Sequence, residues 1–311
     1  MVRPAVPSKI MDEAFIGNRV KVAHILTRLD LGGAQQNTLH TVSHLDRRFE
    51  PLLLCGRGGV LDEEAAALDA AGAVRVRWVP DLVREISPLR DLCAFLQILS
   101  ALSRERPLIV HTHSSKAGVL GRLAARLAGV PIILHTYHGF GFHERQHPLI
   151  QTAYRALEKA CCALSTRLIF VSEANKAYAA KAGLGDPALF VLIRSGVKLS
   201  DFPAPGVRAE EVKASLGTGM HKPLVLSVGN LKPQKNAGDF LKAAQKVLAV
   251  VPEARFVFIG DGPLRSALEA RAMAEGLAGK VLFPGWRRDV PRLLAAADVF
   301  VLTSLWEGLP R

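Results

Sequence analysis

Apolar runs of strand length alternate with stretches of helical periodicity almost without interruption from Val20 onward. Runs such as VKVAHILT and LIVHTH are rich in β-branched residues, whereas the stretches between them repeat apolar residues every three or four positions. In the first half, strands are expected to begin near residues 20, 51, 73, 108, 131, 167 and 189. Helices are expected at 34–45, 63–71, 89–104, 116–128, 149–165 and 173–182. This alternation predicts an α/β fold with a doubly wound parallel sheet.

The pattern stops at SDFPAPGVRAEE, where two prolines and a glycine interrupt it, and resumes with PLVLSVGN. We therefore expect a flexible tail at 1–19, a Rossmann-like domain at 20–203 and a second Rossmann-like domain at 204–311. The second half predicts strands near 224, 255, 280 and 298, and helices at 239–250, 264–274 and 290–296. Four strands are fewer than a doubly wound sheet normally has. The second domain is thus expected to be incomplete, and the sequence truncated at its C-terminus.

Targeting signals and membrane spans are not evident in the sequence. The first 19 residues contain no unbroken apolar stretch of the kind found in secretory signals, and no apolar run approaches the roughly 20 residues that cross a bilayer. The four cysteines lack CxxC spacing, which favours small buried thiols in a reducing compartment. We expect a cytoplasmic protein.

The charge balance adds a preference for anionic partners. Forty basic against 28 acidic residues give a net charge of +12, which suits phosphorylated small molecules, anionic lipid headgroups or nucleic acid. The basic residues form no arginine-rich block, and aromatic residues amount to 6% of the chain. Nucleic acid is therefore not an expected partner.

Loops that follow strands carry the candidate chemistry. Gly32 and Gly33 open a helix after the first strand, where glycine lets the backbone approach an anion, although a simple turn or helix cap is the alternative. The fingerprint GxGxxG is absent, so NAD has weak support. In GNLKPQKN, Lys232 and Lys235 precede a helix N-terminus. Cations are unfavourable there, so an anion between the two would explain them, and a solvated surface pair is the alternative.

Two further loops in the second half complete the pattern. GDGPLR places Gly262 in a tight turn, and SLWEGLP places Glu307 after the last strand. Taken alone, the first is structural and the second is an ordinary helix-start residue. The loops at the carboxyl ends of two facing Rossmann-like domains are expected to line one cleft.

Read in order, these motifs resemble a known family. GGA after the first strand, HG after the fifth, then GNLKPQKN, GDGPLR and FPGWRRDVPRLLAAADVFVLTSLWEGLP look like the retaining, nucleotide-sugar-dependent glycosyltransferases of family 4, which have the GT-B fold. The resemblance spans 20–311 and is more specific in the second half.

The resemblance implies roles for individual residues. Gly33, with Gly32 beside it, matches the glycine that approaches the donor phosphate and sugar, and His138 matches a histidine beside the reacting carbon. Lys235 matches the lysine that grips the diphosphate, with Gly262 in the neighbouring loop. Glu307 matches the first glutamate of an E-x7-E element that contacts sugar hydroxyls. Gly308 and Leu309 would offer backbone N–H groups.

Two departures from the family pattern stand out. The usual arginine partner of the lysine falls on Asn230, so Lys232 or Arg194 would have to replace it. The second glutamate would lie at the eighth position after Glu307, beyond the last residue of the sequence.

Four of the ten histidines lie within HTYHGFGFHERQH, from His135 to His147. In strand alternation, His135 and Tyr137 share a face while His138 lies on the other. Pro148 discourages a helix that would pair His143 with His147, so a metal site is not expected. We interpret His138 as the functional histidine, with Phe140 and Phe142 near the acceptor. His113, which ends the fourth strand, is either an acceptor contact or a hydrogen-bonded strand-end residue.

The expected activity is that of a hexosyl-type glycosyltransferase of class EC 2.4. It would move a sugar from a nucleoside diphosphate, UDP by resemblance, to a glycan or lipid-linked acceptor in bacterial surface polysaccharide synthesis. No DxD-type carboxylate pair is seen, so lysine and helix N-termini would stabilise the leaving diphosphate without metal or cofactor. Peripheral contact with the anionic inner face of the cell membrane is expected. The alternatives are a non-catalytic nucleotide-sugar-binding protein or partner subunit, and a nucleotide-sugar epimerase.

Overall fold

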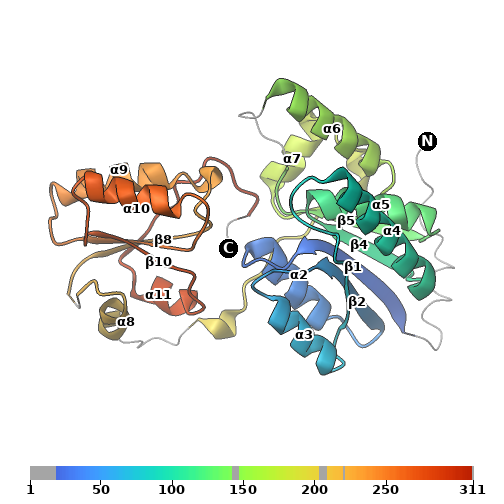
Figure 1. Ribbon diagram of the computed structural model, residues 1–311, viewed down its shortest axis with the longest axis horizontal. Helices are drawn as coiled ribbons and strands as arrows, with labels where there is room; N and C mark the ends of the chain where they lie inside the picture. Colours follow the sequence, from blue (N-terminus) through green and yellow to red (C-terminus); the bar gives the residue numbers. More distant parts are fainter. Residues whose placement is uncertain (1–18, 142–146, 203–208, 220, 310–311) are drawn as a thin grey trace. The chain divides into compact units, whose positions relative to one another are not determined.

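The computed structural model describes residues 19–141, 147–202, 209–219 and 221–309 (Figure 1). The expected tail, apart from its last residue, and the expected boundary at 203–204 lie outside these residues. The chain divides into two compact units, one formed by Met1–Gly196 with Gly308–Arg311 and the other by Val197–Glu307. Each unit is described by itself.

Within its described residues, the first unit contains a seven-stranded parallel sheet in the order β3-β2-β1-β4-β5-β6-β7. The strands are β1 Val20–Arg28, β2 Phe49–Gly56, β3 Arg75–Trp78, β4 Ile109–His113, β5 Ile132–Tyr137, β6 Arg167–Phe170 and β7 Phe190–Leu192. Chain order runs outward from β1 on one side and from β4 on the other. Each expected strand of the first half is present, although β7 is short.

Helices cover both faces of this sheet, which is why its central strands are almost continuously apolar. Helices α4 (Pro88–Glu105) and α5 (Ser115–Leu127) pack on the face that carries Ile25 and Ile133, and α2 (Gly33–Ser43) and α3 (Asp62–Ala70) pack on the face that carries Leu26 and Leu53 (Figure 1). Helices α6 (Pro148–Cys162) and α7 (Glu173–Lys181) follow β5 and β6. They pack on a cluster that includes Phe170.

A buried ion pair joins α5 to α6. Arg122 has no exposed surface, and its Nη2 donates to Glu158 Oε2 at 2.8 Å, which also accepts from Tyr137 Oη at 2.9 Å. Burial and the Glu158 carboxylate raise the pKa of Tyr137 far above its ordinary range. Because breaking such a pair leaves a buried charge unpaired, it fixes α6 against the sheet.

The second unit contains, within its described residues, a four-stranded parallel sheet in the order β10-β9-β8-β11. The strands are β8 Leu224–Val228, β9 Arg255–Ile259, β10 Val281–Gly285 and β11 Val299–Phe300. Helices α9 (Ala237–Leu248) and α10 (Arg265–Ala274) cover one face, and α8 (Ala209–Ser215) and α11 (Val290–Ala296) cover the other (Figure 1). The two Rossmann-like sheets confirm the expected fold class, whereas α8 was not expected.

The cysteines differ in part from the expectation. Cys55, Cys161 and Cys162 are buried thiols, but Cys93 is exposed on α4, so the expectation of buried thiols is wrong for that residue. Among the described residues, no helix combines the length and the apolar character that crossing a bilayer requires.

Candidate functional site

Each sheet has one position where its strand order reverses, and side chains with candidate chemistry gather there. The position lies between β1 and β4 in the first unit and between β8 and β11 in the second. In open α/β sheets, ligands bind at the carboxyl ends of the strands beside such a switch point. The predicted site residues follow β1 (Gly32, Gly33), β5 (His138), β8 (Asn230, Lys232, Lys235), β9 (Gly262) and β11 (Glu307, Gly308, Leu309).

The switch point of the second unit brings a predicted cation and a predicted carboxylate together. After β8 the chain forms a 3-10 turn, Pro233–Lys235, and Asn236 with φ +48° leads into α9. Lys235 Nζ lies 2.5 Å from Glu307 Oε1, and the two side chains are 17% and 21% exposed. A charge-assisted contact of this kind is strong when it is largely removed from water.

Backbone and side-chain hydrogen bonds fix the two loops to each other. Leu305 N donates to the Gln234 carbonyl at 2.9 Å, and Gln234 Nε2 donates to the Trp306 carbonyl at 2.9 Å. Thr303 Oγ1 donates to the Lys235 carbonyl at 2.9 Å. Gln234 and Thr303 position the lysine and the glutamate, and sequence reasoning missed both because neither belongs to a charge pattern.

Glycines in this unit allow the ends of β8 and β9 to approach closely. Gly260 has φ +132°, and a Cβ there would lie 2.0 Å from the Gly229 carbonyl oxygen. A Cβ at Gly262 would lie 2.5 Å from the Leu231 carbonyl oxygen. Close backbone packing is therefore a sufficient reason for Gly262, and its role in donor binding stays a prediction.

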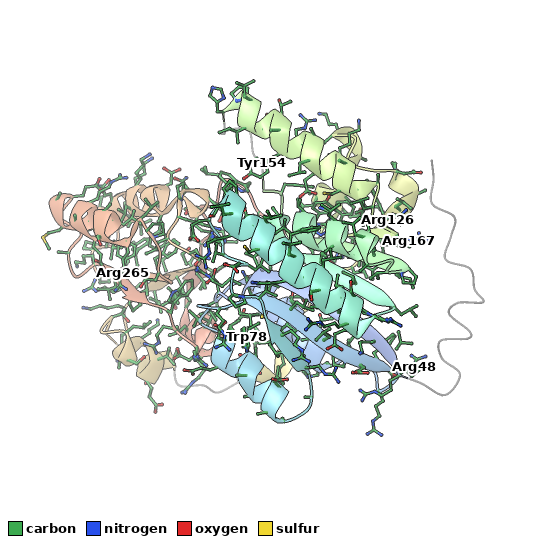
Figure 2. The ribbon with its side chains drawn as sticks, turned by 45° about the vertical axis from the view of Figure 1, so that its right-hand side comes forward. Arg48, Trp78, Arg126, Tyr154, Arg167 and Arg265 are labelled. Carbon is green, nitrogen blue, oxygen red and sulfur yellow. The ribbon has the colours of Figure 1, made fainter. Side chains whose placement is uncertain are left out.

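The turn after β9 is closed by an arginine on α10. Arg265 Nη1 donates to Asp261 Oδ2 at 2.8 Å, and its Nη2 donates to the Phe283 carbonyl at 2.8 Å (Figure 2). The side-chain hydrogen bonds to Glu269 and Asp261 raise the pKa of Arg265. This arginine fixes the loop that carries Gly262.

The position of the expected arginine is occupied by the half-buried Asn230. Lys232 is half-buried in the same loop as Lys235 and directly precedes the 3-10 turn. Arg194 is exposed, follows β7 and belongs to the first unit. Which of the two cations replaces the arginine stays a prediction, as do the donor contacts of Gly308 and Leu309, which are half-buried.

The two glycines that follow β1 lie at the start of a helix, as the sequence predicts. Gly32 precedes α2 with φ −157°, an extended conformation open to any residue, and Gly33 is the first residue of the helix. A Cβ at Gly32 would meet the flexible end of Gln35 at 2.7 Å. The local backbone therefore does not demand glycine, and an approach to donor phosphate stays a prediction.

His138 is joined to a line of histidines at the switch point of the first unit. His113 Nδ1 lies 3.2 Å from His138 Nε2, and His113 Nε2 lies 3.0 Å from His24 Nδ1. His24 on β1 and His111 on β4 are register partners, and His111 Nε2 lies 2.7 Å from Thr136 Oγ1. Sequence reasoning missed His24 because it stands inside an apolar run.

His135 lies on the opposite face of β5, as strand alternation predicts. Its Nδ1 lies 2.8 Å from Thr112 Oγ1, and its ring meets Tyr137 edge-on with centroids 4.4 Å apart. Phe140 packs on Tyr178 and Tyr137. Phe142 and His143 lie outside the described residues, and His147 is exposed where it precedes α6.

Burial keeps this group of histidines neutral. Desolvation lowers the pKa of His24 to about 4, and desolvation followed by mutual repulsion lowers those of His111 and His113 well below 6.5. The pKa of His135 is lowered by burial and then by Arg122. At neutral pH each ring therefore carries one proton and either donates or accepts at each nitrogen.

Neutral histidines are also metal ligands, and one nitrogen from each of His24, His111 and His113 lies within 4.8 Å of the others. Tetrahedral zinc at about 2.0 Å from each nitrogen would hold its ligands about 3.3 Å apart, with their lone pairs aimed at one point. The rings of His24 and His113 are inclined by 8°, and their facing nitrogens are 3.0 Å apart. This geometry suits a hydrogen bond between the two rings.

Ser114, between β4 and α5, has an unusual backbone. Its φ of 62° and ψ of 163° fall in a region that glycine normally occupies, and its Oγ lies 2.8 Å from Thr27 Oγ1. Such conformations cost about 1–3 kcal/mol and concentrate at functional sites. Ser114 thus joins the end of β4, at His113, directly to the first turn of α5.

Comparison with known families decides which protein class this geometry belongs to. Residues 32–196 match a family model described as a glycosyl transferase 4-like domain, and residues 208–311 match the model for glycosyl transferases group 1. The chain belongs to the group 1 glycosyltransferases. This glycosyltransferase is therefore a hexosyl-transferring enzyme with the GT-B fold, as its motifs suggested.

Relatives of this glycosyltransferase include two with more than 30% identity over at least 90% of this chain. One is the Escherichia coli UDP-Gal:alpha-D-GlcNAc-diphosphoundecaprenol alpha-1,3-galactosyltransferase, with 37% identity over 94% of this chain and 76% of its own. Another is the Streptomyces fradiae 2-deoxystreptamine N-acetyl-D-glucosaminyltransferase, with 31% identity over 90% of this chain and 70% of its own.

Solved structures support the fold of this glycosyltransferase. Anabaena HepE in complex with UDP and glucose superposes with a TM-score of 0.77 at 18% identity, covering 94% of this chain and 77% of its own. The UDP-N-acetylglucosamine 2-epimerase from Rickettsia bellii superposes with a TM-score of 0.64 at 16% identity, covering 91% of this chain and 74% of its own. Because both a sugar complex and an epimerase share this fold, fold alone does not choose the reaction.

Proposed function

We propose that this glycosyltransferase moves a sugar, with retention of configuration, from a UDP-sugar to a glycan or lipid-linked acceptor in bacterial surface polysaccharide synthesis. The observation that carries the proposal is the Lys235–Glu307 pair at the switch point of the second unit. Support for the substrates comes from the names of relatives, which include the E. coli enzyme and the N,N'-diacetylbacillosaminyl-diphospho-undecaprenol alpha-1,3-N-acetylgalactosaminyltransferase of Campylobacter jejuni.

The charge of the leaving group explains why a lysine is needed. As the bond between the sugar C1 and the phosphate oxygen breaks, its electron pair stays on the diphosphate, and the Lys235 ammonium stabilises that charge. The acceptor hydroxyl forms the new bond to C1, and its proton passes to the departing phosphate oxygen. No side-chain base and no metal ion are required in this proposal.

The ion pair also suggests how donor binding prepares the site. A diphosphate that contacts Lys235 competes with Glu307 for the same ammonium group, which now lies 2.5 Å from the carboxylate. Glu307 would then accept hydrogen bonds from hydroxyls of the donor sugar. The Lys235–Glu307 ion pair is thus exchanged for a contact of Lys235 with the diphosphate and a contact of Glu307 with the sugar. The nucleotide and the sugar would each bind better in the presence of the other.

The test is a titration followed by a transfer assay. UDP, with GDP and ADP as comparisons, is titrated calorimetrically into the protein, and UDP-galactose is then incubated with and without a lipid diphosphate that ends in N-acetylglucosamine. Preferential UDP binding with acceptor-dependent formation of an α-linked product would support the proposal. UDP binding without transfer to any acceptor would favour a non-catalytic sugar-nucleotide binder. An altered sugar nucleotide formed without acceptor would favour an epimerase.

We further propose that the outer face of α6 contacts an anionic membrane. Leu149, Ile150 and Leu157 are 74%, 51% and 46% exposed on this helix, and Arg155 and Lys159 are exposed about half a turn around it from Ile150 and Leu157. The sole acidic residue of α6, Glu158, points inward, and Tyr154 packs on the core of the unit (Figure 2). Apolar side chains flanked by cations, with no exposed acid, fit an interface of acyl chains and anionic headgroups.

Vesicle sedimentation tests this surface. The protein should sediment with vesicles that contain phosphatidylglycerol but less with phosphatidylcholine alone, and the double variant Arg155→Glu, Lys159→Glu should abolish the difference. Lys246→Glu with Arg292→Glu, an equal charge change at exposed positions of the second unit, is the matched control. If both double variants lose vesicle binding equally, net charge alone explains the binding, and a role for α6 is contradicted.

A further inference from the structure

Three histidine rings form a continuous hydrogen-bonded line that ends at the predicted catalytic histidine. The line runs from His24 on β1 through His113 at the end of β4 to His138 after β5, with nitrogen separations of 3.0 and 3.2 Å. His24 and His113 are 1% and 2% exposed, whereas His138 is half-buried. The inner two rings are thus shielded from water, and the third lies closer to the surface.

The protons of the three rings are coupled. A neutral imidazole carries one N–H, and each hydrogen bond in the line needs one donor and one acceptor. Two arrangements satisfy these conditions. Either every ring is protonated at Nδ1, or every ring is protonated at Nε2. When His138 is neutral, its tautomer is therefore set by that of His24, two rings away.

The inner end of the line favours one arrangement. His24 Nε2 is buried and has no hydrogen-bond partner among the residues that the structure describes. If the rings were protonated at Nε2, this atom would be a buried N–H without an acceptor, a situation that folded proteins almost always avoid. If they are protonated at Nδ1, the atom is a lone pair in an apolar setting. The second arrangement leaves His138 with a proton on Nδ1 and a lone pair on Nε2 that His113 occupies.

We infer that His24 and His113 are positioning residues that hold His138 as its Nδ1–H tautomer, so that this ring acts as a hydrogen-bond donor and not as a base. The identity of the group that receives the bond rests on the proposed function. An N–H donor suits a hydroxyl oxygen of the donor sugar or an oxygen of its phosphate. Because the basic nitrogen of His138 is already occupied, this role agrees with a reaction in which the departing phosphate takes the acceptor's proton.

Nitrogen-15 NMR of the histidine-labelled protein tests the tautomer without any reaction. Long-range proton–nitrogen correlations distinguish a protonated from an unprotonated ring nitrogen, and we expect His138 to be unprotonated at Nε2 at pH 7.5. His113→Leu should leave His138 as a mixture of tautomers. His113→Asn, whose amide can replace the Nδ1–H group, should restore the single state. A His138 that is protonated at Nε2 in the unaltered protein would overturn the inference.

Kinetics supply the second readout. His113→Leu should lower kcat about tenfold with little change in KM for the sugar nucleotide, because it misdirects a donor without removing a binding group. His135→Leu is the matched control, since His135 is equally buried on the opposite face of the sheet and does not join the line. Both variants should lose stability, but His135→Leu should retain the His138 tautomer and the kcat of the folded fraction. Equal losses of kcat would show that burial alone matters and would contradict positioning.

The two proposals fail in different ways. If no sugar is transferred but the Nδ1–H tautomer is found, the proposed reaction is wrong while the histidine line stands. If transfer is normal and the tautomer is mixed, the positioning role is wrong. A third outcome is that the protein binds one equivalent of zinc and the nitrogen signals of His24 and His113 shift or disappear. These two rings would then share a metal ion in place of a hydrogen bond, and the positioning role would also be wrong.

Discussion

The two switch points occupy the same place in a Rossmann-like sheet but differ in charge and burial. In the second unit, Lys235 and Glu307 carry full charges and are held by loops that remain partly exposed. In the first unit, His24 and His113 are neutral, almost fully buried and anchored on strands. The former can exchange its internal partner for an anionic ligand, whereas the latter keeps a fixed pattern of donors and acceptors. Under the proposed function, the charged pair would bind a diphosphate and the histidines would orient a sugar, and these two tasks need different degrees of burial.

Loss of the positive charge at the second switch point should affect the enzyme most. Lys235→Ala should lower kcat by at least roughly a hundredfold, as the loss of one preorganised charge at a developing anion can. Steady-state kinetics measure the effect, and Lys246→Ala, which removes an exposed lysine from α9, is the control. Near-normal turnover in Lys235→Ala would exclude this lysine as the group that stabilises the leaving diphosphate.

The fit of the backbone beneath the charged pair can be tested next. Gly260→Ala should destabilise the second unit by about 3 kcal/mol, because the new side chain is strained and overlaps a carbonyl oxygen. Gly276→Ala offers a comparison at φ +71° with no atom within 4 Å of the added Cβ, and about 1 kcal/mol is expected there. Denaturant unfolding measures both, and equal values would show that the close approach of β8 and β9 is unimportant.

Acid should weaken the neutral site selectively. The folded-state pKa of His24 is about 4, below its unfolded value of about 6.5, so the unfolded chain binds more protons in that interval. Stability should therefore be lost as the pH falls from about 6.5 to 4, by on the order of 3 kcal/mol from His24 alone. Thermal melts of the first unit follow this loss. A His24→Phe variant should show a shallower fall, and an identical pH profile would mean that other groups cause it.

Substitution of His138 should distinguish binding of the sugar from binding of the nucleotide. His138→Ala should reduce kcat for transfer by about tenfold or more while the calorimetric affinity for UDP stays nearly unchanged. A loss of UDP affinity as large as the loss of kcat would place His138 at the nucleotide and not at the sugar.

Much of this molecule follows from local sequence patterns. The alternation of apolar runs and helical periods predicts the strands and nearly all of the helices, since burial on both faces leaves a parallel strand few polar positions. Lys235 and Glu307 were predicted from the family resemblance of motifs in two different loops. Their contact depends on the pairing of β8 with β11, which brings together residues 72 positions apart.

Other parts of the sites leave no local signal. In the sequence, His24 is a single polar residue in an apolar strand. Its place beside the other histidines is evident only from the register of β1 with β4, in which His24 pairs with His111. Gln234 and Thr303 act through backbone carbonyls, to which any donor side chain could bind. The backbone of Ser114 occupies a region that a serine seldom adopts, so no propensity predicts it. Tertiary contacts decide these features, and they include the residues that position the charged pair.

The order of synthesis gives the Lys235–Glu307 pair a further consequence. The ribosome makes Lys235 well before its partner, and α9, β9, α10, β10 and α11 must all follow before Glu307 is joined to the chain. Domains generally fold as units and from the N-terminus during translation. The histidine line of the first unit can therefore close while the second unit is still being made. The charged pair can form only after β11 has been made, so the loops that carry Lys235 and Glu307 come together later than the histidine line.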